Sequence, residues 1–373
     1  MEIEAITDLN PAPRLLLGPG PSMVAPRVLR AMATPLVGHL DPQFLEIMSE
    51  VQQLLRYVFQ TQNELTIPVS GTGSAGMEAA LCNFIEPGDR VLVAINGYFG
   101  TRIYDMAGRY GAVVDKLERP WGEVFDPEEI EAALKGKNYK LLALVHAETS
   151  TGALQPHIAE IAAIAHRHGA LLLLDVVTSL GGLPVEIDAW DVDIAYSASQ
   201  KCLSAPPGLA PLTVSPRARQ VLARRKTPVA NWYLDLTLLT QYWGQERTYH
   251  HTAPISMNYA LREALRLVVE EGLEARFARH RQNAEALWQG LEALDLPLLV
   301  PPQHRLPTLT TPLIPAFADD AGVRRRLLDE FNIEIAGGFG PLKGKVWRIG
   351  LMGFSSRLEN VVLLLGALQR LLS

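Results

Sequence analysis

Seven short apolar runs, separated by longer segments of helical periodicity, constrain the fold of this chain more than any other feature. They lie at residues 65–69, 90–95, 113–115, 141–146, 171–176, 194–197 and 210–214. Strands that are apolar throughout must be covered on both faces, and the intervening helices supply that cover. We therefore expect an α/β fold whose large domain contains a mainly parallel, seven-stranded sheet.

The periodic pattern changes along the chain and predicts three parts. Residues 1–13 contain two prolines and no periodicity, and they are predicted to form an N-terminal arm. Residues 14–271 form the predicted large domain. Residues 272–373 form a predicted smaller α+β domain, entered through a long helix, with Gly272 as the hinge. Its predicted strands lie at 309–313, 333–336 and 346–350, and its predicted helices at 273–294, 321–331 and 357–372.

Composition excludes several classes of protein. A formal net charge of −6 over 373 residues argues against nucleic-acid binding, which usually needs a basic patch. The longest apolar runs are strand-sized and far below the 18 or more residues of a membrane span, so no membrane association is expected. Cys82 and Cys202 are too few for a disulfide framework and favour a reducing compartment, so we expect a cytoplasmic location.

A glycine-rich run at residues 70–76, SGTGSAG, follows one strand and opens a helix. Backbone N–H groups at such a helix start attract phosphate, and Thr72 and Ser74 add hydroxyl donors. The run also fits G-x-G-x-x-G, which would indicate a nicotinamide or flavin dinucleotide. That interpretation needs an acid at the end of the next strand, and the strand at 90–95 is followed by Asn96 and Gly97 instead. The phosphate prediction therefore stands, and the dinucleotide prediction weakens.

Two more polar residues follow apolar strands. Asp175 closes the run at 171–174, and a carboxylate in such surroundings requires a cationic partner. Lys201 follows the strand at 194–197, where desolvation beside a cation would yield the neutral amine that a Schiff base needs. Singly, each feature also fits a structural role: a tight turn, a capping acid or a surface lysine. In this order along one domain, they match the phosphate, ring nitrogen and aldehyde of pyridoxal phosphate.

The chain resembles the class V aminotransferases of the fold-type I pyridoxal-phosphate enzymes, and among them the alanine–glyoxylate and serine–glyoxylate (serine–pyruvate) aminotransferases. The likeness covers nearly the whole chain. Its motifs are LLLGPGP (15–21), GHLD (38–41), SGTG (70–73), ETSTG (148–152), SLGG (179–182), SQK (199–201), APPG (205–208), YHHT (249–252) and GKVWRIG (344–350).

The resemblance implies a role for each matching position. Lys201 would bind the cofactor covalently and then transfer protons, and Asp175 would hold the ring nitrogen. Arg348 would bind the substrate carboxylate, to which its bidentate fork is suited. The other cofactor-binding positions that it implies are Thr72, Gly73, Ser74, Phe99, Ser150, Val177 and Gln200, with Ser150 also near the substrate. Two positions depart from the family pattern, because Phe99 replaces its usual Trp and Ser74 replaces a frequent His.

The resemblance also implies a homodimer with shared active sites. Tyr249 and Thr252 would reach the cofactor phosphate of the neighbouring subunit. The adjacent His250 and His251 do not predict a metal site, because neighbouring residues do not share a face of a helix or strand.

The implied reaction moves the amino group of a small amino acid, alanine or alternatively serine, to glyoxylate by a ping-pong mechanism. A serine–pyruvate or other small-substrate class V aminotransferase is the nearest alternative. A cysteine desulfurase would need a reactive thiol on a later loop, whereas Cys82 lies on a predicted helix and Cys202 beside the lysine. A nicotinamide-dependent oxidoreductase is the alternative from another class.

Overall fold

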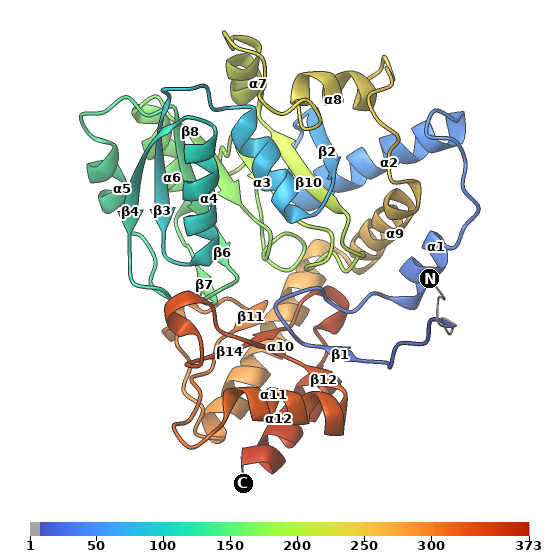
Figure 1. Cartoon of the computed structure of the whole chain (residues 1–373), viewed down its shortest axis with the longest axis vertical. Helices are drawn as coiled ribbons and strands as arrows, with labels where there is room; N and C mark the ends of the chain where they lie inside the picture. The colour runs from blue at the N-terminus through green and yellow to red at the C-terminus, as the bar shows by residue number, and fades with distance from the viewer. Residues whose placement is uncertain (1–7, 373) are drawn as a thin grey trace, which may run out of the picture.

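A seven-stranded sheet forms the centre of the computed structural model, which describes residues 8–372 (Figure 1). The strand order is β2-β10-β9-β8-β5-β3-β4. Strand β10 runs antiparallel to both of its neighbours, and the remaining pairs are parallel. The predicted mainly parallel α/β sheet is thus confirmed. Its strands are β2 (Leu65–Ser70), β3 (Arg90–Ile95), β4 (Val113–Glu118), β5 (Leu141–Val145), β8 (Leu171–Asp175), β9 (Ile194–Tyr196) and β10 (Leu209–Val214).

Helices cover both faces of this sheet, so its strands are buried on both sides. Within β3, Leu92 and Ala94 pack into one core while Val91 and Val93 pack into the other, as the two-residue period of a strand requires. Helices α5 (Pro127–Leu134), α6 (Ile158–Arg167) and α9 (Ile255–Glu271) line mainly the first core. Helices α3 (Gly73–Cys82), α4 (Tyr98–Arg109), α7 (Pro216–Ala223) and α8 (Leu236–Trp243) line the second, and α2 (Pro42–Phe59) contributes to both.

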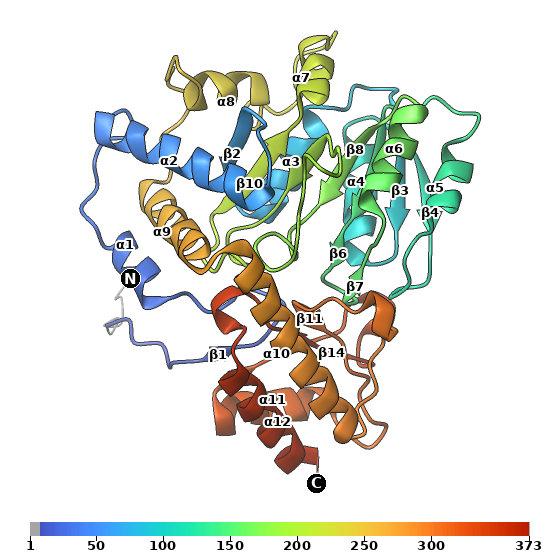
Figure 2. The ribbon, with the colours of Figure 1, turned by 180° about the vertical axis from the view of Figure 1, so that it is seen from behind.

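A smaller C-terminal part lies below the sheet in Figure 1 and has its own core. Seen from behind, α10 (Leu273–Ala293) runs down this part, and it meets α9 at Gly272, which has a φ of 81° (Figure 2). Strand β14 (Trp347–Gly350) lies between β11 (Leu309–Thr310) and β13 (Ala336–Gly337), and helices α11 (Asp320–Phe331) and α12 (Leu358–Leu372) pack beside them.

The N-terminal segment joins this C-terminal part. Strand β1 (Leu15–Leu16) pairs in parallel with β12 (Ile333–Glu334), and Leu17 is fully buried in the C-terminal core. The sequence predicted a strand at 333–336, and the structure divides that stretch between β12 and β13. The division into residues 14–271 and 272–373 stays a prediction.

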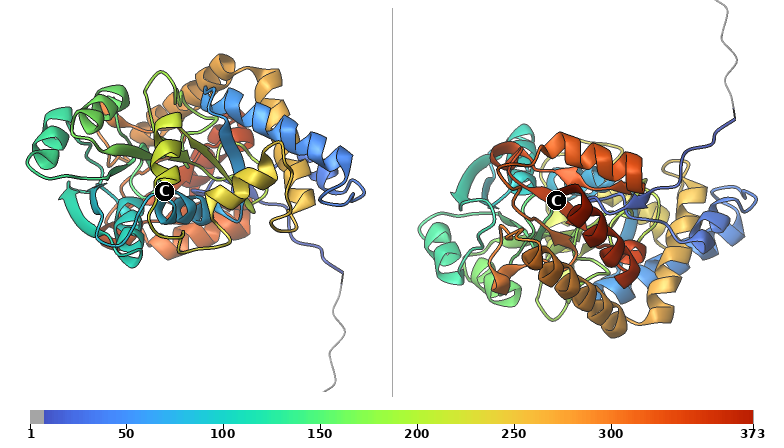
Figure 3. Two further views of the ribbon diagram at one scale, coloured as in Figure 1. Left: turned by 90° about the horizontal axis from the view of Figure 1, so that it is seen from above. Right: turned by 90° about the horizontal axis from the view of Figure 1, so that it is seen from below.

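Residues 8–13, the described portion of the predicted arm, are exposed and lead away from the body (Figure 3). The rest of that prediction, residues 1–7, falls outside the described residues. Among residues 8–372, no helix is both long enough and apolar enough to cross a bilayer.

Candidate active site

The glycine-rich run forms the turn from β2 into α3. Thr72 is the exposed N-cap residue of α3, and no side chain accepts a hydrogen bond from the first turn of the helix. The Ala75 N–H donates to the Thr72 carbonyl, whereas the N–H groups of Gly73 and Ser74 have no partner in residues 8–372 and are available to an anion. A Cβ on Gly73 would lie 2.8 Å from the Cβ of Ala198, and one on Gly76 would lie 3.0 Å from that of Ala210. Close packing of α3 against the sheet therefore explains these glycines without a dinucleotide.

Asp175 ends β8 and is almost fully buried, at 2% exposure. Its Oδ1 accepts a hydrogen bond from the Val177 N–H at 2.9 Å, and its Oδ2 accepts one from the Tyr196 hydroxyl at 2.7 Å. Burial raises the pKa of Asp175 to about 6, although the Tyr196 hydrogen bond opposes that shift. A carboxylate held in this way is available to a cationic or protonated partner.

Lys201 lies in the turn that follows β9, and its Nζ donates a hydrogen bond to the Pro19 carbonyl. Burial lowers the pKa of Lys201 to about 8, and the positive charges of Arg348 and Arg102 act in the same direction. A Cβ on Gly20 would come within 2.8 Å of Nζ, so only a glycine lets the 18–21 segment cover this lysine. A large share of the neutral, nucleophilic amine is thus present near pH 8.

Arg348 reaches the site from β14 of the C-terminal part and is 4% exposed. Its Nε donates to the Gly337 carbonyl at 2.7 Å, and its Cζ lies 3.9 Å from the centroid of the Phe339 ring. Within residues 8–372, its two terminal nitrogens have no hydrogen-bond or ion-pair partner. Burial lowers the pKa of Arg348 to about 10. A positioned guanidinium with two free terminal nitrogens is suited to a carboxylate.

Ser150 is fully buried and is fixed by Glu148, a residue to which the sequence analysis gave no role. The Ser150 hydroxyl donates to Glu148 Oε1 at 2.6 Å and accepts from the Tyr98 N–H at 2.9 Å. Glu148 Oε2 accepts from the N–H groups of Phe99 and Gly100 at 3.2 and 3.4 Å. One buried carboxylate therefore joins the turn between β6 (Ala147–Glu148) and β7 (Ala153–Leu154) to the start of α4.

Glu148 gave the same signal as Asp175, because it is an acid that closely follows an apolar strand. Burial raises the pKa of Glu148, while its hydrogen bonds from Ser150 and Gly100 favour the ionised form. We regard it as the carboxylate, because all four of its hydrogen-bond partners are donors.

Phe99 is half-buried in the first turn of α4, and Arg102 lies beside it. The Cζ of Arg102 is 4.9 Å from the centroid of the Phe99 ring, and its Nη1 donates to the Ser74 hydroxyl at 3.3 Å. No carboxylate in residues 8–372 pairs with Arg102. Arg102 carries no sequence signal of a site, because it lies one turn along a helix instead of at the end of a strand.

Gln200 precedes the lysine, and its side-chain amide makes no hydrogen bond within the described chain. Its Oε1 is buried without a partner, although its backbone carbonyl accepts from the Ser22 N–H at 2.9 Å. Buried polar groups normally have partners, so this amide indicates a missing ligand.

Tyr249 and Thr252 are exposed on the surface of this single chain, and the Tyr249 ring packs against His39 with centroids 5.2 Å apart. Between them, His251 places its Nε2 2.7 Å from the hydroxyl of Ser70, the last residue before the glycine-rich turn. The segment is therefore anchored beside the glycine-rich turn at residues 70–76, which we call the cradle, with Tyr249 and Thr252 exposed.

Both cysteine thiols are buried, and burial raises their pKa values to about 12. A thiol that stays protonated is a poor nucleophile, which argues against a cysteine desulfurase. In residues 8–372 no three or more His, Cys, Asp or Glu residues are grouped so as to hold a metal ion.

Comparison with protein families gives a match to the model "Aminotransferase class-V" over residues 15–341. The chain belongs to the class V aminotransferase family. It is 45% identical to the (S)-ureidoglycine–glyoxylate transaminase of Bacillus subtilis, with 96% of this chain and 90% of that protein covered. It is 44% identical to the alanine–glyoxylate aminotransferase of Mus musculus, with 93% and 85% covered.

Solved structures agree with this assignment and with the predicted fold-type I architecture. An alanine–glyoxylate aminotransferase from Nostoc sp. matches with a TM-score of 0.97 and 57% identity, covering 99% of this chain and 98% of that one. The ureidoglycine–glyoxylate aminotransferase of Bacillus subtilis matches with a TM-score of 0.96 and 46% identity, covering 98% and 94%. The family and the fold class predicted from sequence are thus confirmed, and the residue-by-residue site assignment stays a prediction.

Proposed function

We propose that this aminotransferase uses pyridoxal phosphate to move the amino group of a small amino acid to glyoxylate. The observation that carries the proposal is the set of groups gathered around Lys201. Burial lowers the pKa of its amine to about 8, and the charges of the buried Asp175 and of Arg348, whose terminal nitrogens are free, both act on that pKa. These three groups suit an aldehyde, a ring nitrogen and a substrate carboxylate.

The residues of the site fit the cofactor in its remaining parts as well. The uncapped start of α3 suits the phosphate group, with Thr72, Gly73 and Ser74 as its donors. The unpaired Gln200 amide suits the same group, and Val177 and the Phe99 ring would lie beside the cofactor ring. Bound there, pyridoxal phosphate supplies an electron sink for the substrate α-carbon.

The chain's own groups would then act on the substrate. Arg348 holds the α-carboxylate, which amino and keto acids share, so both occupy one site in turn, as a ping-pong mechanism requires. The Lys201 amine would take the proton from the substrate α-carbon and deliver it to the cofactor carbon that carried the aldehyde. Asp175 would keep the ring nitrogen protonated. Ser150 directs its own proton to Glu148, so its oxygen would be available as an acceptor to the cofactor hydroxyl.

We propose alanine as the amino donor, with serine as the alternative and glyoxylate as the acceptor. The names of the similar proteins support glyoxylate, and they add ureidoglycine as a donor to be compared. The deciding experiment is a single-turnover screen. Loaded enzyme is mixed with alanine, serine or (S)-ureidoglycine, and the visible absorbance change is followed. Loss of the yellow colour fastest with alanine supports the proposal, and no change with any amino acid contradicts the function.

We propose that two copies of the chain share their active sites. A group of large apolar side chains is exposed beside the cradle, which is unusual for a surface that faces water alone. Its members are Leu36 (67% exposed), Leu40 (45%), Trp232 (62%), Tyr233 (43%) and Tyr249 (56%). Such a surface fits a second copy, and pairing would bring Tyr249 and Thr252 to the partner's cradle.

Complementation tests this arrangement. Lys201→Ala and the double variant Tyr249→Phe/Thr252→Ala are each purified, then mixed under conditions that exchange subunits. Shared sites predict that the mixed dimer regains activity, because one of its two sites has every residue intact. If the mixture stays at the mean activity of its parents, the sites are not shared. We further place the enzyme in the cytoplasm because both cysteines are free thiols, which fractionation of cells would check.

A further inference from the structure

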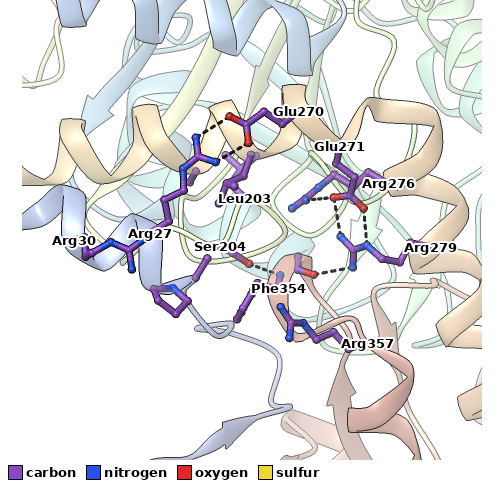
Figure 4. A pocket seen from close by; sticks show the side chains of 15 residues that line it. Arg27, Arg30, Leu203, Ser204, Glu270, Glu271, Arg276, Arg279, Phe354 and Arg357 are labelled. Carbon is purple, nitrogen blue, oxygen red and sulfur yellow. Dashed lines mark hydrogen bonds and ion pairs between the residues drawn. The ribbon is translucent and has the colours of Figure 1, made fainter.

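A cavity of about 650 Å³ is lined in part by Leu203 and Ser204, which follow Lys201 in the chain (Figure 4). Its lining comes from the start of α1 (Pro26–Met32), the turn at Leu203 and Ser204, the junction of α9 with α10, and the loop at 353–357. Neither Lys201 nor any other proposed active-site residue lines it. Its volume is in the range of pockets that hold metabolites.

The charge of this lining is opposite to that of the whole chain. It contains two glutamates and five arginines, and no lysine, aspartate or histidine, which gives a net charge of +3 in a protein of net charge −6. A concave surface of one sign concentrates ions of the opposite sign. The charged members are Arg27, Arg30, Arg276, Arg279, Arg357, Glu270 and Glu271.

Three of the arginines form ion pairs within the chain. Arg276 and Arg279 both pair with Glu271, at 2.7 and 2.6 Å, and donate to backbone carbonyls as well. Arg27 pairs with Glu270 at 2.6 Å. These side chains form a fixed wall in which both glutamates are already neutralised (Figure 4).

The other two arginines have no such partner. Within residues 8–372, no hydrogen bond or ion pair engages the side chain of Arg30 or Arg357. The guanidinium of Arg357 instead lies 3.8 Å from the centroid of the Phe354 ring, which holds it at the cavity while leaving its N–H groups free. Two uncompensated charges at one cavity are the feature of an anion site.

The floor of the cavity is connected to the backbone of Lys201 through two hydroxyl groups. The Ser204 hydroxyl accepts from the Phe354 N–H at 2.8 Å and lies 3.1 Å from the Ser22 hydroxyl. The Ser22 hydroxyl donates to the Lys201 carbonyl at 2.8 Å. A ligand that fixes Arg357 and Phe354 would therefore restrain the turn on which Lys201 is mounted.

We propose that this cavity binds a small anion of two or more negative charges, recognised through phosphate or carboxylate oxygens by Arg30 and Arg357, and that its binding is coupled to the Lys201 turn. The site is separate from the proposed substrate site, and its anion binding does not depend on the proposed reaction.

Anion titrations of the purified cofactor-loaded protein test the proposal. Inorganic phosphate and citrate are titrated separately by calorimetry, with sodium chloride holding the ionic strength constant. The pocket variant is Arg30→Gln/Arg357→Gln. The matched control, Arg224→Gln/Arg325→Gln, removes the same charge from exposed arginines elsewhere. We expect saturable binding by the wild type and the control, weakened at least tenfold in the pocket variant. The tighter of the two anions identifies the preferred group.

Equal binding by all three proteins, or no saturable binding by the wild type, would overturn the site. Anion binding at the cradle or at Arg348 would persist in the pocket variant, because its substitutions leave those groups intact. If the anion binds in the cavity, Arg348→Gln should leave the titration unchanged. For the coupling, the pH midpoint of the visible cofactor band is measured with and without the anion. A shift in the wild type that is absent from the pocket variant supports the coupling, and the lack of any shift contradicts it.

Discussion

The two sides of the Lys201 turn hold buried arginines in opposite states of pairing. Behind the turn, Arg276 is 6% exposed, and it donates to the carbonyls of Gly181 and Cys202 and pairs with Glu271. In front of the turn, Arg348 is 4% exposed, yet only its Nε has a partner within the described chain. Both charges are removed from water, but the fold compensates only one of them.

This difference separates a structural charge from a functional one. A buried charge is costly unless hydrogen bonds and opposite charges replace its water. Where the chain supplies all of these, as for Arg276, the residue stabilises the fold. Where both terminal nitrogens are left over, as for Arg348, a ligand must supply the acceptors. Arg30 and Arg357 share with Arg348 only the lack of a protein partner, because they are exposed and water meets their N–H groups until an anion binds.

The largest loss of turnover is expected when Lys201 is substituted. Lys201→Ala should lower turnover by about 10⁴-fold or more, because it removes the amine that links the cofactor and transfers protons. The protein should remain folded, since Nζ has a single protein partner, the Pro19 carbonyl. Loss of the visible cofactor band together with an unchanged melting curve would support this role. Full turnover by the variant would contradict it.

Arg348→Gln and Arg276→Gln test directly whether one arginine serves activity and the other serves stability. Arg348→Gln should lower kcat/KM about 10²- to 10³-fold for amino and keto substrates alike, a loss of about 3–4 kcal/mol, with little change in stability. Arg276→Gln removes one of two arginine partners from the half-buried Glu271 and takes the guanidinium away from the Gly181 and Cys202 carbonyls, so it should cost about 3 kcal/mol of unfolding free energy. Denaturant titrations and steady-state kinetics on both variants check this. The reverse pattern, or an effect of Arg348→Gln on the donor alone, would refute the distinction.

Asp175 provides a pH test in the cofactor-free protein. Its folded-state pKa of about 6 lies above the ordinary aspartate value of 3.8, so the folded state binds this proton more tightly than the unfolded one. Its contribution to stability is therefore fully present below pH 3.8 and is lost as the pH rises through 6, about 3 kcal/mol in all. Asp175→Asn should remove this loss. The measurement is the difference in unfolding free energy between wild type and variant from pH 4 to pH 7; a constant difference would disprove it.

The smallest effect is expected from Glu148→Gln. The amide keeps the shape but turns donors toward the N–H groups of Phe99 and Gly100, or toward Ser150, so kcat should fall about tenfold through misplacement of these groups. The matched control is Glu129→Gln, which alters the carboxylate that accepts from the Asp126 N–H at the start of α5. The control should change the melting temperature without changing kcat. Equal kcat values for the two variants would show that Glu148 is structural only.

The buried strands were predictable because their signal is local. The apolar run at 90–95 coincides with β3, and the other six differ from the observed strands by a few residues at their ends. Strand direction was not predictable, because an apolar run reads alike in both directions; β10 is antiparallel to its neighbours. The pairing of β1 with β12 was missed, because two-residue strands carry no periodicity.

The site residues also differ in whether a local sequence signal predicted them. Asp175 and Lys201 stood out because a polar residue directly after a buried strand is costly without a purpose. Glu148 gave the same signal but lay inside a motif that drew attention to Ser150. Arg102 gave none, because an arginine on a helix is ordinary until packing places it beside Phe99 and Ser74.

By itself, the sequence determined the buried strands, the glycine-rich helix start and the polar residues at or just after the ends of two strands, since burial and backbone geometry act over a few neighbouring residues. Only the tertiary structure decided that the Pro19 carbonyl meets Lys201, that the charge of Arg348 acts on Lys201, and that Arg30 and Arg357 lie at one cavity. Such meetings join residues from distant parts of the chain. They depend on the packing of whole elements, for which no local pattern exists.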